Sequence, residues 1–442
     1  MRLIQTIKNI FKIEDLRARL IYTFGIILLY RLGKYVTLPG IDPSQLAGLK
    51  SQTSSGIMGL LDMFSGGAFS QASVFALGIM PYISASIVVQ LLGIVFPYFQ
   101  KLQKEGESGR RKMNQYTRYL TVGILILQAP TYLVNLHAQL PASAFILQGT
   151  FFTISSVIIL TAGTMFVMWL GEKITDKGIG NGISLIIMIG IVARMPANFI
   201  FEAGTRMNGA GGAVALIVEI VFLFVVVLGT ILLVQGTRRV PVQYARRIIG
   251  NKQYGGVRQY IPLKVNAAGV MPIIFAQAIM MLPIIIAGYS NSGSGFVVAF
   301  SNMYGFWYNL VTAILIVVFT YFYTAITINP VQMAEDMKKN GGFIPGIKPG
   351  RKTVEFLDNI MSRITFPGSL FLAMVAILPS VAVRAGVTPQ FAQFYGGTSL
   401  LILVGVILDT LQQIESHLLM RHYDGLMKSG RIKGRSGAVT SA

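Results

Sequence analysis

Long runs of apolar residues, separated by shorter polar stretches, follow one another along most of the chain. Runs of about 20 apolar residues match the roughly 30 Å hydrocarbon core of a bilayer at 1.5 Å rise per residue. A membrane β-barrel would instead show short segments of alternating apolar and polar residues. The pattern predicts ten transmembrane helices, near residues 20–38, 73–96, 119–136, 151–170, 183–201, 213–235, 267–288, 306–328, 364–383 and 394–414.

The composition supports an all-α polytopic membrane protein. Hydrophobic residues make up 53% of the 442 and charged residues only 12%, against roughly 25% charged in an average soluble protein. There are no cysteines, which excludes disulfides and thiolate metal ligands. The three histidines are scattered among loops and tail. We therefore expect neither a metal site nor a cofactor.

The formal net charge of +20 is distributed very unevenly. Alternate loops and the two termini carry 31 of the 37 Lys and Arg residues. Loops rich in Lys and Arg stay on the cytoplasmic side of a membrane. The sequence thus predicts that both termini are cytoplasmic.

Ten spans divide into two sets of five, which we place at residues 1–202 and 203–442. An odd number of spans in each half forces the halves into opposite orientations, as in the inverted repeats of many transport proteins. No residue-level similarity between the halves accompanies this division. The prediction of two inverted five-helix halves therefore comes from topology alone.

Two of the basic loops, residues 236–265 and 329–363, are unusually long and carry 13 Lys and Arg residues between them. The first alternates β-branched and aromatic residues around Gly255 and Gly256, which predicts a projecting β-hairpin. The second predicts helical pieces on either side of a tip rich in Gly and Pro. These are either solvated loops that fix topology or surfaces that dock an acidic protein or RNA, with some charge facing anionic lipid.

Ionisable residues within the predicted spans are few: Arg194, Glu219 and Asp409. Ion-coupled transporters usually concentrate carboxylates near the membrane midplane. Glu219 and Asp409 lie away from it, and we interpret both as structural. Because paired carboxylates, nucleophile motifs and phosphate-binding loops are also missing from the sequence, we do not expect this chain to be an enzyme.

Small and weakly polar residues instead recur in the spans predicted at 73–96, 119–136 and 267–288. Glycine alone accounts for 47 of the 442 residues. Hydrogen bonds between membrane helices contribute only about 0.6–2 kcal/mol each. One interpretation is ordinary helix packing, and the other is a seam built to open. The polar residues concerned are Ser84, Ser86, Gln90, Gln128 and Gln277.

Several stretches are far more specific than composition. In chain order they are "FSGGAFSQASVFALGIMPYISASI", "EGESGRRKMNQYTRY", "MWLGEKITDKGIGNGIS", "PLKVNAAGVMPIIFA", "FIPGIKPG" and "FYGGTSLLILV". The chain resembles the SecY family, the channel subunits of the bacterial Sec protein translocase. The resemblance implies an hourglass pore between the halves and a lateral gate to the lipid. Its implied function is to pass unfolded secretory polypeptides across the cytoplasmic membrane and to release transmembrane segments sideways.

The resemblance also implies roles for particular residues. The plug, a short helix near residues 57–67 that fills the resting pore, would include Ile57, Leu60, Leu61, Met63, Phe64, Gly66 and Gly67. The pore ring, a constriction of branched aliphatic side chains, would comprise Ile79, Ile83, Ile187, Ile274 and Ile402. The lateral gate would include Ser84, Gln90, Gln128 and Gln277.

In the same way, the resemblance implies that the basic loops dock the SecA motor and the ribosome. The residues implied are Arg238, Arg239, Arg246, Arg247, Lys348 and Arg351. One departure is Lys348, where the family usually has Arg, and lysine lacks the planar bidentate fork of arginine. Further implied partners are SecE-like and SecG-like membrane subunits, clients with signal sequences, and anionic lipids.

A five-plus-five secondary transporter for a small solute is the alternative function. The large basic loops, the aliphatic ring and the scarcity of midplane carboxylates all favour the channel.

Overall fold

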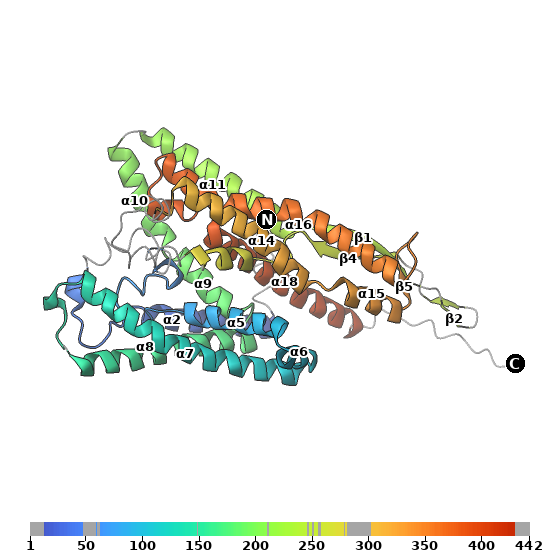
Figure 1. The fold of residues 1–442 in the computed structure, drawn as a ribbon, viewed down its shortest axis with the longest axis horizontal. Helices are drawn as coiled ribbons and strands as arrows, with labels where there is room; N and C mark the ends of the chain where they lie inside the picture. Colours follow the sequence, from blue (N-terminus) through green and yellow to red (C-terminus); the bar gives the residue numbers. More distant parts are fainter. Residues whose placement is uncertain are drawn as a thin grey trace.

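The computed structural model describes residues 13–46, 59, 62–147, 149–209, 212–244, 247–249, 252–254, 258–277, 279–280 and 302–428 (Figure 1). Its α-helices are α2 (Glu14–Gly33), α5 (Met80–Val95), α6 (Pro97–Lys104), α7 (Glu107–Gln139), α8 (Thr150–Lys177), α9 (Gly182–Val192), α10 (Met195–Asn208), α11 (Gly212–Gln235), α14 (Phe306–Thr327), α15 (Pro330–Lys339), α16 (Arg351–Arg384), α17 (Pro389–Ala392) and α18 (Gly397–Lys428). Residues 271–277 are helical as well. Two 3₁₀ turns, η1 (Pro43–Leu46) and η2 (Ala142–Ala144), lie in loops.

Seven helical stretches in the described part are long and apolar enough to cross a membrane, and counting the bent pair α5–α6 as one span adds an eighth. These stretches correspond to eight of the ten predicted spans. The first predicted span, α2, also contains Arg17, Arg19 and Arg31, and the seventh extends beyond the described residues. The chain is therefore a multi-pass helical membrane protein, and the count of ten stays a prediction.

Two predicted spans begin or continue differently from the sequence pattern. The span predicted at 73–96 was wrong at its start, because residues 65–79 form successive turns and the helix begins at Met80. The span predicted at 183–201 is broken between α9 and α10 at Ala193 and Arg194. Pro196 lies in the first turn of α10, where its missing N–H costs no helical hydrogen bond.

The helices form two groups (Figure 1). α2, α5, α7 and α8 pack in one group, and α11, α14, α16 and α18 pack in the other. α9 joins them because it contacts both α8 and α18. α10, which contains the predicted boundary at residue 202, packs mainly against α11 and α17 of the second group. The inverted relation of the halves stays a prediction.

A small β-sheet projects from the second group. Strand β1 (Thr237–Tyr244) pairs antiparallel with β4 (Arg258–Lys264) from Thr237–Lys264 to Gln243–Arg258, which confirms the predicted hairpin. Its tip is a second ladder, β2 (Arg247–Ile249) with β3 (Lys252–Tyr254). Ile249 pairs with Lys252 at the end of this ladder. Gly255 and Gly256, around which the hairpin was predicted, lie outside the described residues.

The second basic loop completes the same sheet. Strand β5 (Gly342–Phe343) pairs with β1 at Gln243 and Tyr244. The buried side chains beneath the sheet come from both loops and from α16: Val240, Val242, Leu263, Met337, Ile344, Leu357 and Met361. The two loops, separate in the sequence, thus form one packed unit whose burial of apolar surface stabilises it.

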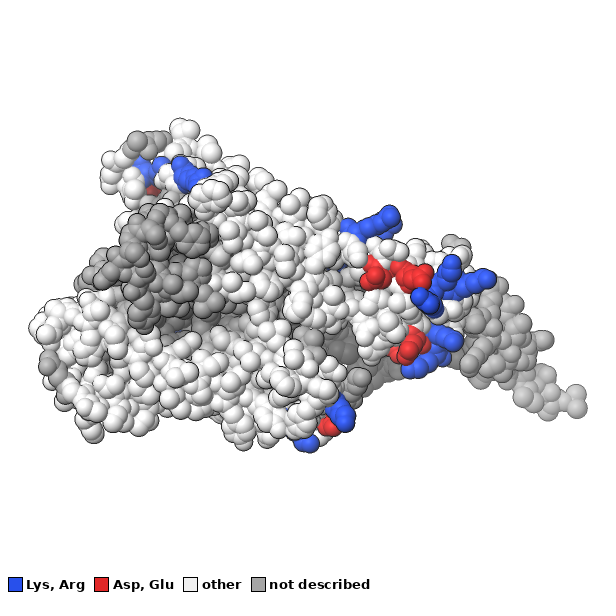
Figure 2. All heavy atoms as spheres, viewed as in Figure 1, with Lys and Arg blue, Asp and Glu red and all other residues white. Residues whose placement is uncertain are grey.

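Charged side chains gather at the ends of the molecule. Figure 2 shows acidic and basic side chains around the sheet and α15, and a broad band without charge over the helices on this face. This is the distribution expected of a protein with a hydrocarbon-facing belt.

Glu219 lies in a buried ion-pair network of the second helix group, which agrees with our interpretation of this residue as structural. Arg206 Nε donates to Glu202 at 3.1 Å, and its other arm pairs with Glu219. The backbone N–H of Thr388 donates to Glu202 at 3.0 Å. Both glutamates are buried, with exposed fractions of 0% and 8%. The network ties α10, α11 and the segment before α17 together. Asp409, in contrast, is exposed on α18.

Replacing Arg206 with alanine tests this network. The change leaves two buried carboxylates without a cation, and breaking a buried pair in this way costs about 3–5 kcal/mol. We expect the thermal unfolding midpoint of the detergent-solubilised protein to fall by several degrees. Arg111→Ala, which removes the exposed pair with Glu107, is the matched control and should leave the midpoint unchanged. Equal midpoints for both variants would contradict the structural role of Arg206.

Candidate pore, gate and docking surfaces

Residues 62–70, which contain the described end of the plug predicted near residues 57–67, are buried throughout. Residues 62–64 are helical and turns follow. Met63 and Phe64 are 1% and 7% exposed and belong to the central apolar cluster. Ile57, Leu60 and Leu61 lie outside the described residues.

Gly66 and Gly67 allow this segment to approach its neighbours closely. Both have positive φ angles, +64° and +89°, which residues with a side chain rarely adopt. A Cβ on Gly66 would also stand 2.9 Å from the Cα of Gly190 in α9, too close for real atoms. Glycine is therefore required at position 66 by the backbone contact with α9 and at position 67 by its positive φ angle and the nearby Lys34 side chain.

Three of the five predicted ring residues are buried in a single cluster, the central apolar cluster, which contains side chains from both helix groups. Ile79 caps α5, Ile187 lies in α9 and Ile402 in α18, with exposed fractions of 2%, 5% and 8%. Ile83 of α5 is partly buried and packs against the same cluster. Met63 and Phe64 are members too, so the predicted plug and ring are in one packed unit.

Ile274 is the ring residue that the structure does not bring into this cluster. It lies in the helical segment 271–277 and is partly buried. Val270, just before this segment, packs against the central cluster instead. Both positions are aliphatic, so residue type alone does not distinguish them.

Gln90 is the predicted gate residue that joins the two helix groups. The hydroxyl of Tyr323 in α14 donates to Gln90 Oε1 at 3.1 Å, while the Gln90 amide lies 3.5 Å from the hydroxyl of Ser86. α5 and α14 belong to different groups. This hydrogen bond therefore bridges the seam between them.

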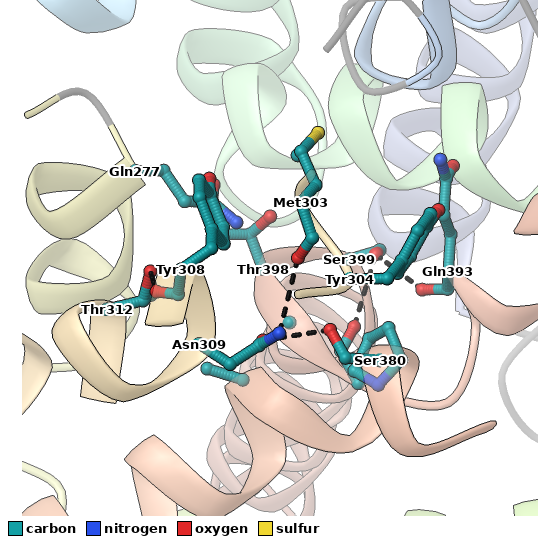
Figure 3. A pocket seen from close by; sticks show the side chains of 14 residues that line it. Gln277, Met303, Tyr304, Tyr308, Asn309, Thr312, Ser380, Gln393, Thr398 and Ser399 are labelled. Atoms are coloured by element: carbon teal, nitrogen blue, oxygen red, sulfur yellow. Dashed lines mark hydrogen bonds between the residues drawn. The ribbon is translucent and has the colours of Figure 1, made fainter. Parts of the chain in front are cut away.

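The other predicted gate residues lie apart from this bridge. Ser84 is partly buried in α5, and Gln128 is exposed on α7. Figure 3 shows Gln277 at a polar pocket with Tyr308 and Thr312 of α14. In the same pocket, Asn309 Oδ1 accepts a 2.8 Å hydrogen bond from Ser380 of α16. Among the described residues, Gln277 is thus placed within the second group.

The predicted docking residues on β1 point to different faces of the sheet. Val240 and Val242 are buried over the cluster beneath it, and Arg238 has the same strand parity. Arg239 lies on the opposite, outer face, across from Pro262 in β4. Tyr260, which is 56% exposed, shares that face two positions away.

The remaining docking candidates are spread around the same unit. Lys348 is exposed, and its backbone carbonyl accepts a 3.1 Å hydrogen bond from Thr353. Arg351 begins α16 with 94% of its side chain exposed and pairs with Glu355. The backbone of Arg247 is in β2, whereas Arg246 lies outside the described residues.

Sequence reasoning missed three functional candidates. Tyr323 is an ordinary interfacial tyrosine by its sequence context. Asp62 is a single acidic residue in an apolar run, and Arg194 was noted only as one of the few ionisable residues in the predicted spans, with no partner or role. In the structure Arg194 and Asp62 form an ion pair. The available signal was that Asp62 and Arg194 carry opposite charges and that each lies in an apolar stretch of sequence.

No group of three or more His, Cys, Asp or Glu side chains in the described part of the chain is placed to hold a metal ion. The geometry instead combines several apolar helices, the central apolar cluster shared by two helix groups, and a polar bridge at their seam. These features define a multi-pass helical membrane protein of the channel class.

Comparison with known proteins identifies the family. The SecY family model matches residues 73–411. The protein translocase subunit SecY of Corynebacterium glutamicum is 44% identical over 438 residues, covering 95% of this chain and 98% of that protein. The SecY subunit of Mycobacterium tuberculosis is 44% identical over 440 residues, covering 94% and 97%. The chain belongs to the SecY family.

Solved structures share the fold. A protein-conducting channel superimposes with a TM-score of 0.59 at 17% identity, covering 90% of this chain and 92% of that one. A SecY protein whose plug domain was studied gives 0.58 at 16% identity, with the same coverage. Sec61 in a canine ribosome-channel complex gives 0.55 at 16% identity, also covering 90% and 92%.

Replacing Tyr323 with phenylalanine tests the bridge across the seam. The change removes the hydroxyl that donates to Gln90 and keeps the ring. Because a hydrogen bond between membrane helices is worth about 0.6–2 kcal/mol, the open seam should become roughly 3- to 30-fold more populated. Membrane insertion of a weakly apolar test segment through reconstituted protein should rise accordingly. Tyr321→Phe, on the same helix two residues away, is the control, and equal insertion by both variants would contradict the bridge.

Proposed function

We propose that this chain is the channel through which unfolded secretory polypeptides cross the cytoplasmic membrane, and from which transmembrane segments leave sideways into lipid. One observation carries the proposal: the two helix groups of a SecY-family chain meet at the central apolar cluster, which includes residues 63 and 64. A barrier of this kind lies where a pore between the groups would be.

Ile79, Ile83, Ile187 and Ile402 would form the pore ring, with Ile274 or Val270 on its remaining side. Branched aliphatic side chains repel water, so a narrow ring of them blocks ions by dewetting. They also lack charges that would hold particular residues of a client. The ring would therefore seal the resting pore and yield around many different polypeptides.

The segment that includes Met63, Phe64, Gly66 and Gly67 would be the plug. Its burial against the ring supports this role. So does the similarity to a SecY structure whose plug domain stabilises the closed channel and maintains the membrane seal. Moving the segment away would expose the aliphatic ring to a client.

The seam between α5 and α14 would be the lateral gate. The hydrogen bond from Tyr323 to Gln90 crosses it. Because such a bond is weak and uncharged, a passing apolar segment can replace it with contacts of its own and with lipid. Ser84, Gln128 and Gln277 would line the seam in other states of the gate.

The sheet unit built from both basic loops would dock the SecA motor and the ribosome. Arg239 on its outer face and the exposed Lys348 and Arg351 support this role, because acidic protein and RNA both attract such cations. Sec61, a fold relative, occurs in a ribosome-channel complex. Both termini would be cytoplasmic, SecE-like and SecG-like subunits would complete the translocase, and anionic lipids would contact the basic surface. The motor would supply the energy, and this chain no catalytic residue.

Membership of the SecY family favours this channel over the small-solute transporter that the five-plus-five topology also permits. The pairing of the buried carboxylates supports the same choice. Glu219 is held by Arg206, and Asp62 by Arg194, so neither is placed to bind a transported ion.

Replacing two isoleucines of the ring with glycine tests the seal. We expect Ile83→Gly with Ile187→Gly to raise the ion conductance of resting, client-free vesicles severalfold, because glycine removes the side chains that exclude water. The measurement is ion flux into vesicles that contain the purified translocase.

The control is Ile154→Gly with Ile158→Gly. These two residues lie on α8, are 57% and 62% exposed, and face lipid. This variant suffers the same loss of helix propensity but should remain as tight as the wild type. A ring variant that leaks no more than this control would exclude these isoleucines from the barrier.

Reversing the charge of Arg239 tests the docking surface. Arg239→Glu should slow motor-driven secretion several-fold and leave the amount of assembled protein unchanged, because the side chain lies on the outer face of the sheet. The rate is measured with purified SecA and a signal-bearing client.

Arg111→Glu is the matched control, since it makes the same charge change on another exposed, basic loop region. Equal secretion rates for the two variants would assign the effect to overall charge, and a normal rate for Arg239→Glu would remove Arg239 from the docking surface.

A further inference from the structure

Residues 62–70, the plug segment of the proposed function, are held by polar contacts from three sides. The hydroxyl of Tyr30 in α2 donates to the Ser65 carbonyl at 3.3 Å, and Arg31 donates to the Gly66 carbonyl at 3.3 Å. From α7, the hydroxyl of Tyr132 donates to the Phe69 carbonyl at 3.0 Å. All three contacts are made to backbone, so they depend on position and not on side-chain identity.

The contact with the α9–α10 junction is different because it joins two charges. Arg194, at the break between these helices, pairs with the carboxylate of Asp62. The backbone N–H of Ser70 donates to the same carboxylate at 2.8 Å, and Arg194 also reaches the hydroxyl of Ser70 at 3.4 Å. The Asp62 side chain is 2% exposed and that of Arg194 is 26% exposed. The pair thus closes residues 62–70 into a loop and fastens that loop to the junction.

The distribution of cations makes this pair unusual. Six Lys and Arg residues lie outside the basic cytoplasmic loops and termini, and three of them, Arg31, Lys34 and Arg194, gather at this segment. A Cβ on Gly67 would stand 2.8 Å from Lys34 Nζ and 3.2 Å from Arg194 Nε. Asp62 is the one carboxylate in the segment, so it alone offers these cations a formal counter-charge there.

We propose that Asp62 and Arg194 form a latch that holds the plug segment in its closed position. The proposal rests on the plug role proposed above and adds the residues that fasten it. While the segment stays packed, the pair is shielded from water and strong. Once the segment moves outward, both charges are hydrated, so the latch resists small displacements without preventing full opening.

The latch predicts that a buried residue of the plug segment becomes accessible when the pair is broken. The chain has no cysteine, so an introduced one is a unique reporter. Ser65→Cys places it in the plug segment, where Ser65 is 2% exposed, and Ser369→Cys places a control in α16, where Ser369 is 0% exposed. Each reporter is combined with Asp62→Asn or with Arg194→Gln, and labelling by a water-soluble thiol reagent is timed in resting vesicles together with ion leak.

We expect either latch variant to speed labelling of the Ser65→Cys reporter about tenfold or more and to raise ion leak, while the Ser369→Cys reporter stays protected. Arg194→Lys, which keeps the positive charge beside Asp62, should label the Ser65→Cys reporter within about threefold of the wild-type rate. Asp42→Asn, a partly buried aspartate in the loop after α2 whose carboxylate accepts a hydrogen bond from the Ser44 N–H, is the matched control and should change neither readout.

Three outcomes would overturn the latch: wild-type labelling in both Asp62→Asn and Arg194→Gln, faster labelling of both reporters, or labelling as fast in Arg194→Lys as in Arg194→Gln. The first would mean that the pair holds nothing, the second that it stabilises the whole fold, and the third that the shape of the Arg194 side chain and not its charge is responsible.

A separate deletion of residues 57–67 distinguishes failure of the latch from failure of the plug. If the deletion leaks and the single variants do not, the plug role stands and the latch is wrong. If the deletion does not leak, the plug role itself is wrong.

Discussion

Hydrocarbon offers no hydrogen bonds, so a charge that lies away from the aqueous ends needs a partner inside the protein. This constraint accounts for the four partly buried cations that the structure describes outside the basic loops, whereas the fifth, Arg384, is exposed. Arg31, Lys34 and Arg194 surround the plug segment, and Arg206 lies between Glu202 and Glu219. Arg384 donates to the Tyr304 carbonyl at 3.2 Å. The polar contacts in the outer part of the molecule are therefore few, specific and placed where segments meet.

The end of the molecule that carries the two long basic loops is built differently because its charges reach water. Charged side chains such as Arg239 and Arg351 remain exposed, and the small apolar cluster beneath them stabilises the sheet unit. β5 joins the second basic loop to the first, and α16 continues unbroken from this unit into the membrane over 34 residues, about 51 Å. A force applied to the sheet is therefore transmitted through α16 to the second helix group.

Periodicity and charge were sufficient to predict the helical membrane class, most spans and the β1–β4 hairpin, because these depend on local composition. The break at Arg194 and the turns over residues 65–79 were missed because tertiary contacts override an apolar pattern there. Family motifs selected Ile79, Ile187 and Ile402, which do share one cluster. Tyr323 and the Asp62–Arg194 pair could not be predicted, since each depends on residues more than 130 positions apart.

In the proposed mechanism the two ways out of the pore are closed by different chemistry. The path across the membrane is closed by an aliphatic cluster and an ion pair, which together resist water and ions. The path into lipid is crossed by a neutral hydrogen bond between Tyr323 and Gln90. An apolar client segment gains free energy by entering lipid and can displace that weak bond, whereas it gains nothing by separating two charges. The sideways path therefore responds to the hydrophobicity of the client, and the transverse path to the motor that drives it.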